Sequence, residues 1–183
     1  MQNGQPLLAM EIPGQQGSPY PEPFASLGTS TAFRRLADRF GLTQLGVNMI
    51  TLEPGTQSGL RHWHSPEDEF VYVIEGELTL RTNSGECQLP KGMCIGFKAQ
   101  DRNAHLVLNR SGAVAHYLVV GSRVPGDVSF YPDDDLAWFP TEEGDRATHK
   151  DGRPYPNGGA DDVRADSQDR SDHLLPGRPN AKD

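Results

Sequence analysis

Residues 61–70 read Arg61-His62-Trp63-His64-Ser65-Pro66-Glu67-Asp68-Glu69-Phe70, and this stretch decides both the fold and the site. Alternate side chains of a strand share a face, so His62 and His64 point the same way and Trp63 points oppositely. Their Cα atoms would lie roughly 6.6 Å apart, and two imidazoles that each bind a metal at about 2.0 to 2.1 Å can close that gap by converging. Glu69 and the later His105 complete a set of three imidazoles and one carboxylate. We therefore predict one metal ion inside a β-barrel.

The carboxylate has to be chosen from three consecutive acidic residues. Ser65-Pro66 predicts a turn after His64, and the next strand begins near Glu69, whose parity with Val71 places it toward the barrel interior. Glu69 is therefore the predicted ligand. Glu67 and Asp68 are expected to be solvated turn residues, with Glu67 as an outer-shell acid if the turn folds back.

The middle of the chain has the pattern of short strands separated by turn residues. Apolar and β-branched runs alternate with pairs such as Pro54-Gly55, Glu75-Gly76 and Lys91-Gly92. Eight strands so spaced predict an all-β sandwich or jelly roll. The expected strands are 46–53, 60–64, 69–74, 77–82, 86–89, 93–97, 104–109 and 113–120.

Both flanks differ from this core. Residues 1–43 are expected to form an irregular arm rich in Gly, Pro, Gln and Ser, followed by a short helix that carries Phe33, Leu36 and Phe40 and ends at Gly41. The barrel core is expected over 44–123. Residues 124–183 form a polar C-terminal extension, and from about residue 158 it lacks large apolar side chains and is expected to be disordered.

Composition limits the class of protein. A chain of 183 residues with 17 basic and 25 acidic side chains has a net charge of −8, which predicts no nucleic-acid partner. Cys87 and Cys94 lack a metal-ligand spacing and are expected to be reduced thiols. No leader and no apolar run long enough for a membrane span is visible. We therefore expect one domain in a cytoplasmic protein that does not associate with a membrane.

At this point the chain resembles the cupin superfamily. Its first motif is matched by Gly55, His62, His64, Glu69 and Gly76, with one extra residue between Gly55 and His62, and its second by His105 and Asn109. The usual Pro-x-Gly of the second motif is replaced by Lys98-Ala99-Gln100. Flanking segments at 20–24, 131–133 and 148–152 resemble a bacterial subgroup of small single-domain cupins, described as uncharacterised or as sugar-phosphate isomerase-like. The resemblance implies a jelly-roll barrel, a bound metal and a homodimer.

Several further residues have two readings. Arg102, before His105, and His116, on a predicted strand, are weak candidates for substrate contacts, and a structural or surface role competes for His116. Asn109 shares the parity of His105, but a turn cap explains it equally well. Trp63 points away from the metal and is expected to pack against the arm or a second subunit, which supports a homodimer.

The ligand set predicts one divalent transition metal, which can be zinc, iron, manganese, nickel or copper. A five- or six-coordinate ion with four protein ligands keeps positions open for a small oxygenated molecule or dioxygen. The expected function is a metal-dependent isomerase or dioxygenase in which Glu69 also acts as a proton acceptor. The alternatives are a non-catalytic small-molecule binder or sensor, and a degenerate site kept for its fold.

Overall fold

The computed structural model describes residues 5–27, 31–141 and 144–159, and strands make up most of them. Helical structure in these ranges is limited to one short 3-10 helix and a single α-helical turn, and neither is long and apolar enough to span a membrane. The elements are η1 (Ala9–Glu11), β1 (Thr31–Arg35), α1 (Leu36–Arg39), β2 (Leu45–Leu52), β3 (Trp63–His64), β4 (Glu69–Glu75), β5 (Glu77–Thr82), β6 (Gly85–Pro90), β7 (Cys94–Phe97), β8 (Leu106–Leu108), β9 (Ala115–Ser122), β10 (Ser129–Tyr131), β11 (Leu136–Thr141), β12 (Gly144–Thr148) and β13 (Pro154–Gly159).

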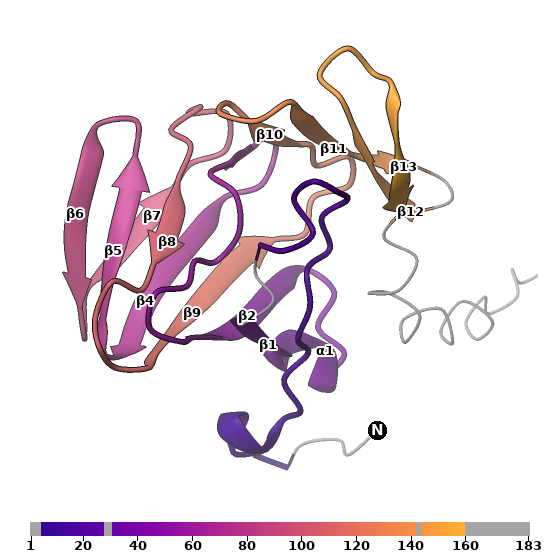
Figure 1. The fold of residues 1–183 in the computed structure, drawn as a ribbon. Coiled ribbons are helices and arrows are strands. Elements are labelled where there is room, and N and C mark those ends of the chain that lie inside the picture. Colours follow the sequence, from indigo (N-terminus) through magenta and orange to yellow (C-terminus); the bar gives the residue numbers. More distant parts are fainter. Residues whose placement is uncertain (1–4, 28–30, 142–143, 160–183) are drawn as a thin grey trace, which may run out of the picture.

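Two sheets face each other across the main hydrophobic core (Figure 1). One has the strand order β1-β2-β9-β4-β7 and the other the order β6-β5-β8. The core between them is built from the inward residues of each strand, because alternate side chains point to opposite faces. Its fully buried members include Ile50, Val73, Leu78, Leu80 and Tyr117. The predicted all-β jelly-roll architecture is confirmed.

A third sheet with the order β13-β12-β11-β10-β3 lies beside the barrel, at the upper right of Figure 1. The sequence pattern placed no strand beyond residue 123. The extension nevertheless folds as far as the structure describes it, because Tyr131, Leu136, Ala147 and Tyr155 form a second buried cluster. The expected disorder concerns residues that lie almost entirely outside the described part of the chain.

The first segment of the barrel also differs from the expected helix. Phe33 belongs to β1, where it pairs with Ile50 of β2, and only Leu36–Arg39 are helical. Gly41 follows with a φ of +68°, as expected for a residue that ends a helix. Cross-strand pairing places Phe33 against the barrel core, and this burial outweighs the helical spacing of the three apolar residues.

The N-terminal arm runs alongside the barrel toward β10 and β11 (Figure 1). The Tyr20 ring makes edge contacts with Tyr131 and Trp138, at centroid distances of 5.9 and 6.2 Å, and its hydroxyl accepts a hydrogen bond from the Leu60 amide. Phe24 makes a similar edge contact with Tyr155. The arm and the extension therefore cover one side of the barrel together.

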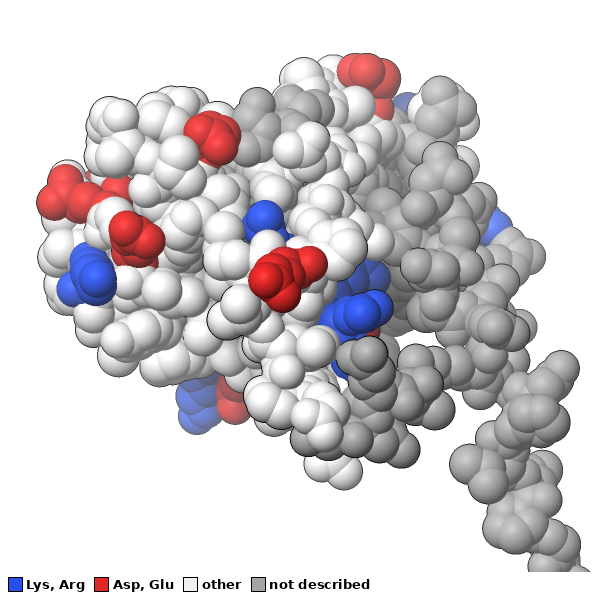
Figure 2. Space-filling model, turned by 90° about the horizontal axis from the view of Figure 1, so that it is seen from below, with Lys and Arg blue, Asp and Glu red and all other residues white. Residues whose placement is uncertain are grey.

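Charged side chains on the face shown in Figure 2 are spread out. Lysine and arginine side chains lie near acidic ones and among uncharged residues, and over the described part of this face they form no continuous basic surface.

Candidate metal centre

Three segments bring the four predicted ligands together. His62 and His105 face each other through a pair of backbone hydrogen bonds, with N–O distances of 2.8 and 3.1 Å. His64 follows two residues later in β3, and Glu69 is the first residue of β4. The alternation expected for residues 62–64 holds, because the rings of His62 and His64 lie with their centroids 5.0 Å apart.

The side-chain atoms of this group lie at distances that suit one ion. Glu69 Oε1 is 2.8 Å from His105 Nε2, and Glu69 Oε2 is 3.7 Å from His64 Nε2. One ligand atom from each of His62, Glu69 and His105 lies within 4.8 Å of the others. Two ligands held at about 2.1 Å from one ion are roughly 3.0 to 3.4 Å apart in octahedral or tetrahedral geometry. The observed spacings bracket these values.

Hydrogen bonds orient two of the imidazoles. Nδ1 of His62 lies 2.8 Å from the Leu60 carbonyl oxygen, and Nδ1 of His64 lies 2.6 Å from Asp127 Oδ2. Each Nδ1–H therefore donates, which leaves the lone pair on Nε2 for a metal. The ring of His105 stacks on Phe97, and its buried Nδ1 has no hydrogen-bond partner. The donor set therefore fits a divalent transition metal.

The electrostatics favour the protonation states that a metal requires at His62 and Glu69, whereas at His64 burial is outweighed by the hydrogen bond with Asp127 and by nearby carboxylates, which raise its pKa. Burial, followed by electrostatic repulsion from His105 and His64, lowers the pKa of His62 to about 4. Burial also opposes the charge on Glu69, but the hydrogen bond from His105 and the electrostatic attraction of the surrounding imidazoles outweigh it, and the pKa falls to about 2. At neutral pH the site therefore presents a neutral imidazole at His62 and an ionised carboxylate.

Asp127, in the C-terminal extension, was missed by the sequence analysis. It follows the turn at Gly126 and reaches His64 because β10 pairs with β3, in the register of Ser129 with His64. No motif in the sequence indicates this residue, since its role depends on the pairing of two short strands far apart in the chain. A carboxylate on the distal nitrogen of a histidine ligand fixes the ring and raises its basicity.

Replacing Asp127 by alanine is expected to weaken metal binding by about 10- to 100-fold, the usual range for an outer-shell partner of a histidine ligand. Competition with a chromophoric chelator measures the change. Asp135→Ala is the matched control, because Asp135 holds His149 through the same kind of contact at 2.8 Å. If both variants bind the metal as tightly as the wild type does, Asp127 does not support the site.

The segment Lys98-Ala99-Gln100 keeps the path of the loop before His105. Gln100 has a φ of +65°, a conformation usually taken by glycine, and its amide bonds the His64 carbonyl at 3.3 Å. The Ala99 amide donates to the Asp68 carboxylate at 2.7 Å. His105 is 3 % exposed and lies beside Glu69, so the missing glycine does not displace it.

Gln100→Gly is expected to stabilise the protein by about 0.5 to 1 kcal/mol, because glycine adopts positive φ without the Cβ clash that other residues suffer. Urea denaturation of the metal-free protein measures it. Gln88→Gly, at an exposed position of β6, serves as the control and is expected to destabilise. A loss of stability in Gln100→Gly would contradict the account of this loop.

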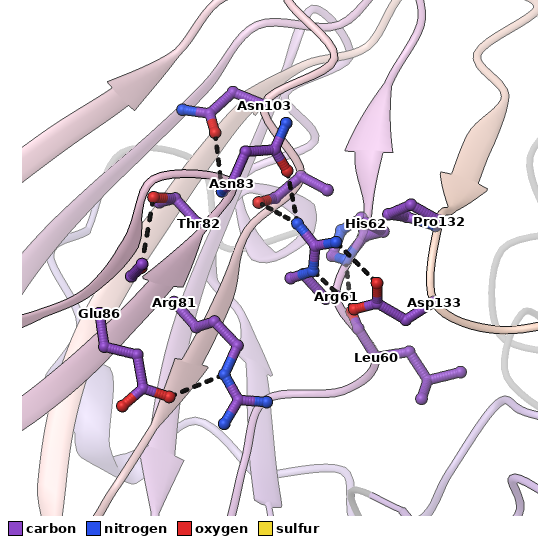
Figure 3. A network of polar contacts seen from close by, with 12 residues as sticks. Leu60, Arg61, His62, Arg81, Thr82, Asn83, Glu86, Asn103, Pro132 and Asp133 are labelled. Atoms are coloured by element: carbon purple, nitrogen blue, oxygen red, sulfur yellow. Dashed lines mark hydrogen bonds and ion pairs between the residues drawn. The ribbon is translucent and has the colours of Figure 1, made fainter.

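Arg61 ties the segment that carries His62 to three other parts of the molecule (Figure 3). Its guanidinium forms two bonds with the Asp133 carboxylate, at 2.6 and 2.7 Å, and also donates to Asn83 and to the Ala104 carbonyl. The Arg61 hydrogen bond lowers the pKa of Asp133. The β5–β6 turn, the loop before His105 and the extension thus hold the first histidine in register.

A cavity of about 240 Å³ adjoins the ligands on the inside of the barrel. His62, Glu69 and His105 lie at one end of it, and the hydroxyl groups of Ser58 and Tyr117 line it. The remaining lining comes from the arm and from the inner faces of the strands: Gly17, Pro19, Tyr20, Leu27, Phe33, Asn48, Ile50, Val71, Val107 and Val119. On the other side of the ligands, a much smaller hollow is lined by residues that include His64, Glu67 and Lys98.

The weaker candidates lie away from the cavity. His116 accompanies Thr51 through a contact of 3.0 Å between Oγ1 and Nδ1, and it lines neither hollow. Arg102 lies 5.8 Å over the Trp63 ring. The structure therefore provides no contact that supports a substrate role for either residue.

Other residues near the motif have structural partners. Glu67 accepts a hydrogen bond from the Val124 amide, and Oε1 lies 2.9 Å from that nitrogen. The Asn109 amide group bonds the carbonyls of Leu52 and Ala113 and accepts from Ser111, so it closes a turn. Trp63 stacks on Phe130 with a centroid distance of 4.4 Å, and its cover is therefore the C-terminal extension of the same chain.

Comparison with known proteins decides the family. A cupin domain model matches residues 48–121. A crystal structure of a sugar phosphate isomerase from a cupin superfamily, from Silicibacter pomeroyi, is 41 % identical, with a TM-score of 0.79 over 82 % of this chain and 96 % of that one. The chain belongs to the cupin superfamily.

Two further structures show how far the likeness extends. A structure from Acidithiobacillus ferrooxidans shares 28 % identity with this cupin, with a TM-score of 0.61 over 65 % of this chain and 76 % of that one. The polyketide cyclase RemF from Streptomyces resistomycificus is 17 % identical, with a TM-score of 0.55 over 67 % of this cupin and 82 % of its own chain, and shows the fold alone. A search of curated proteins found no match.

Proposed function

We propose that this cupin is a mononuclear metal-dependent enzyme that acts on a small oxygenated molecule, with isomerisation favoured over oxygen-dependent cleavage. One observation carries the proposal: three imidazoles and a carboxylate converge in the barrel, and His62, Glu69 and His105 of this group line a cavity there. Isomerisation is favoured because the 41 % identical relative from Silicibacter pomeroyi is named a sugar phosphate isomerase.

The proposed ligands are His62, His64, Glu69 and His105. A divalent transition metal held by them would supply Lewis acidity toward a carbonyl or hydroxyl oxygen of the substrate. Glu69 Oε1 lies 2.8 Å from His105 Nε2, whereas Oε2 lies 3.7 Å from His64 Nε2. Oε2 is thus the carboxylate oxygen that can accept a proton from a bound substrate. Valine and isoleucine side chains line the cavity that adjoins it.

The alternative is a metal-dependent small-molecule binder without catalysis. The cavity supports it in one respect, because the described lining residues other than the proposed ligands offer hydroxyl and amide groups but no second carboxylate or imidazole. A binder would capture a metabolite from a cell extract and release it unchanged.

The test starts from protein purified without added metal. Zinc or manganese in the preparation directs the assay to a panel of aldose and ketose isomerisations, and iron directs it to oxygen uptake with catechols, thiols and diketones. Turnover that is lost in Glu69→Ala supports the enzyme. No turnover in either panel, together with tight and unchanged capture of a metabolite, would favour the binder.

We also propose a homodimer, on a surface other than the Trp63 face expected from the sequence. The outer face of β4 exposes Phe70 and Tyr72, which are 42 and 40 % accessible and lie beside Val120 and Leu118 of β9. A second copy would cover this apolar face. Light scattering is expected to give a dimeric mass for the wild type and a monomeric mass for Phe70→Glu, and a monomeric wild type would contradict the proposal.

A cytoplasmic location is likewise our proposal. Cys87 and Cys94 are both free and exposed, which suits a reducing compartment.

A further inference from the structure

The cavity has a metal-binding end but no cation along its described lining. The side chains beyond the ligands are apolar or carry neutral hydroxyl, phenol or amide groups. A ligand that carries an anionic group would therefore need a positive charge just beyond these walls.

Arg35 lies at that position. It is the last residue of β1 and pairs with Asn48 of β2. The same row of paired residues continues across the sheet to Val119 of β9 and Val71 of β4. Asn48, Val119 and Val71 all line the cavity, so Arg35 is the fourth member of one cross-strand row whose other members face the interior. Phe33, two residues earlier in β1, lines the cavity as well, which places Arg35 on the same face.

The guanidinium of Arg35 is available for a ligand. The residue is half-buried, and no side chain in the described part of the chain forms a hydrogen bond or ion pair with it. Its neighbour Arg34, on the opposite face, instead donates to Thr51 at 3.0 Å. A half-buried guanidinium without a counter-charge binds carboxylate or phosphate oxygens well, because its planar fork matches their geometry.

The spacing limits the size of the ligand. Arg35 and Val71 are separated by three strand intervals, or about 14 Å at the usual distance between strands, and Glu69 lies two residues, or about 7 Å, further along β4. The Glu69 and Arg35 side chains reach inward from the two ends, and this leaves room for a chain of roughly five carbons.

We propose that the natural ligand has two different ends: an oxygen function that meets the metal site and an anionic group, phosphate or carboxylate, that is held by Arg35. This inference rests on the proposed function, since it uses the same cavity and the same ligands. Arg35 is a binding residue in this proposal, and Asn48 lies between it and the metal end.

The experiment compares matched ligand pairs on the metal-loaded, full-length protein by calorimetry. Ribose 5-phosphate is paired with ribose, and 4-oxopentanoate with 2-pentanone, so that each pair differs mainly in the anionic group. In at least one pair the anion is expected to bind roughly tenfold more tightly than its neutral partner. The pair that shows this preference identifies the anion as phosphate or carboxylate.

Three variants test whether Arg35 causes the preference for the anionic ligand of each pair. Arg35→Gln is expected to abolish this preference. Two control variants are expected to keep it: Arg39→Gln, which changes an exposed arginine of α1, and Lys98→Gln, which changes a lysine at the hollow on the other side of the ligands. The inference would be overturned by any of three results: the wild type shows no preference for the anion, Arg35→Gln keeps the preference, or only Lys98→Gln loses it.

Metal content is measured on the same samples and separates the two proposals. Arg35→Gln is expected to hold the metal and to unfold at the wild-type temperature. A protein that binds metal but shows no preference for anions would overturn only the role of Arg35. A wild-type protein that holds no metal would remove the proposed function itself.

Discussion

Replacing Glu69 by glutamine is expected to lower metal affinity by at least about 100-fold, more than the loss of an outer-shell partner. The carboxylate is the only anionic member of the proposed ligand set, and its side chain is 15 % exposed. Glutamine keeps the shape but removes the charge that draws a cation into a buried site. Competition with a chelator, followed by metal analysis of the dialysed protein, measures the change.

Glu67→Gln is the matched control for that variant. Glu67 belongs to the same acidic run, but its Oε1 accepts from the Val124 backbone rather than from a proposed ligand. We expect its effect on metal affinity to be less than tenfold, below the usual range for the loss of an outer-shell partner. Equal affinities in Glu69→Gln and the wild type would show that the carboxylate is not a ligand.

Gly76→Ala is expected to destabilise the protein by about 2 to 4 kcal/mol, through positive φ and overpacking together. Gly76 has a φ of +85°, and a Cβ there would meet Ala115 Cβ at 2.8 Å and Ala115 Cα at 2.9 Å. Neither atom can move without a shift of β9, since Ala115 is fully buried. Urea denaturation of the metal-free protein measures the loss.

Gly92→Ala separates the two causes. Gly92 has nearly the same φ, +87°, but a Cβ there would have no heavy atom within 4 Å. Only the conformational cost of about 1 to 2 kcal/mol is therefore expected at this position. If both variants lose the same stability, the close approach of β9 to the turn at Gly76 has no energetic consequence.

Much of the barrel could be predicted from the sequence, because local rules govern it. Strand periodicity and turn residues placed the strands of the two facing sheets, apart from β1, within a few residues of their ends. The same alternation predicted that His62 and His64 share a face, and the parity of Glu69 predicted its inward direction. These features depend on residues close together in the chain.

The features that the sequence analysis missed depend on contacts between distant segments. β10 is only three residues long, and its pairing with β3 brings Asp127 to His64. Tyr20 of the arm contacts Leu60, and Tyr20 and Phe24 pack against the buried cluster of the extension. In the sequence these aromatic residues are isolated among Gly and Pro residues, so no periodic pattern indicates their partners. The spacing of Phe33 and Leu36 predicts a helix, but Phe33 lies in a strand because it pairs with Ile50 of β2.

Metal analysis of the full-length wild type beside the His62→Ala, His64→Ala double variant tests the central claim most directly. Both proteins should be produced and purified in parallel without added metal. We expect one divalent transition metal per chain in the wild type and almost none in the double variant, and thermal unfolding shows whether the variant is folded. Equal metal content in the two folded proteins would contradict it.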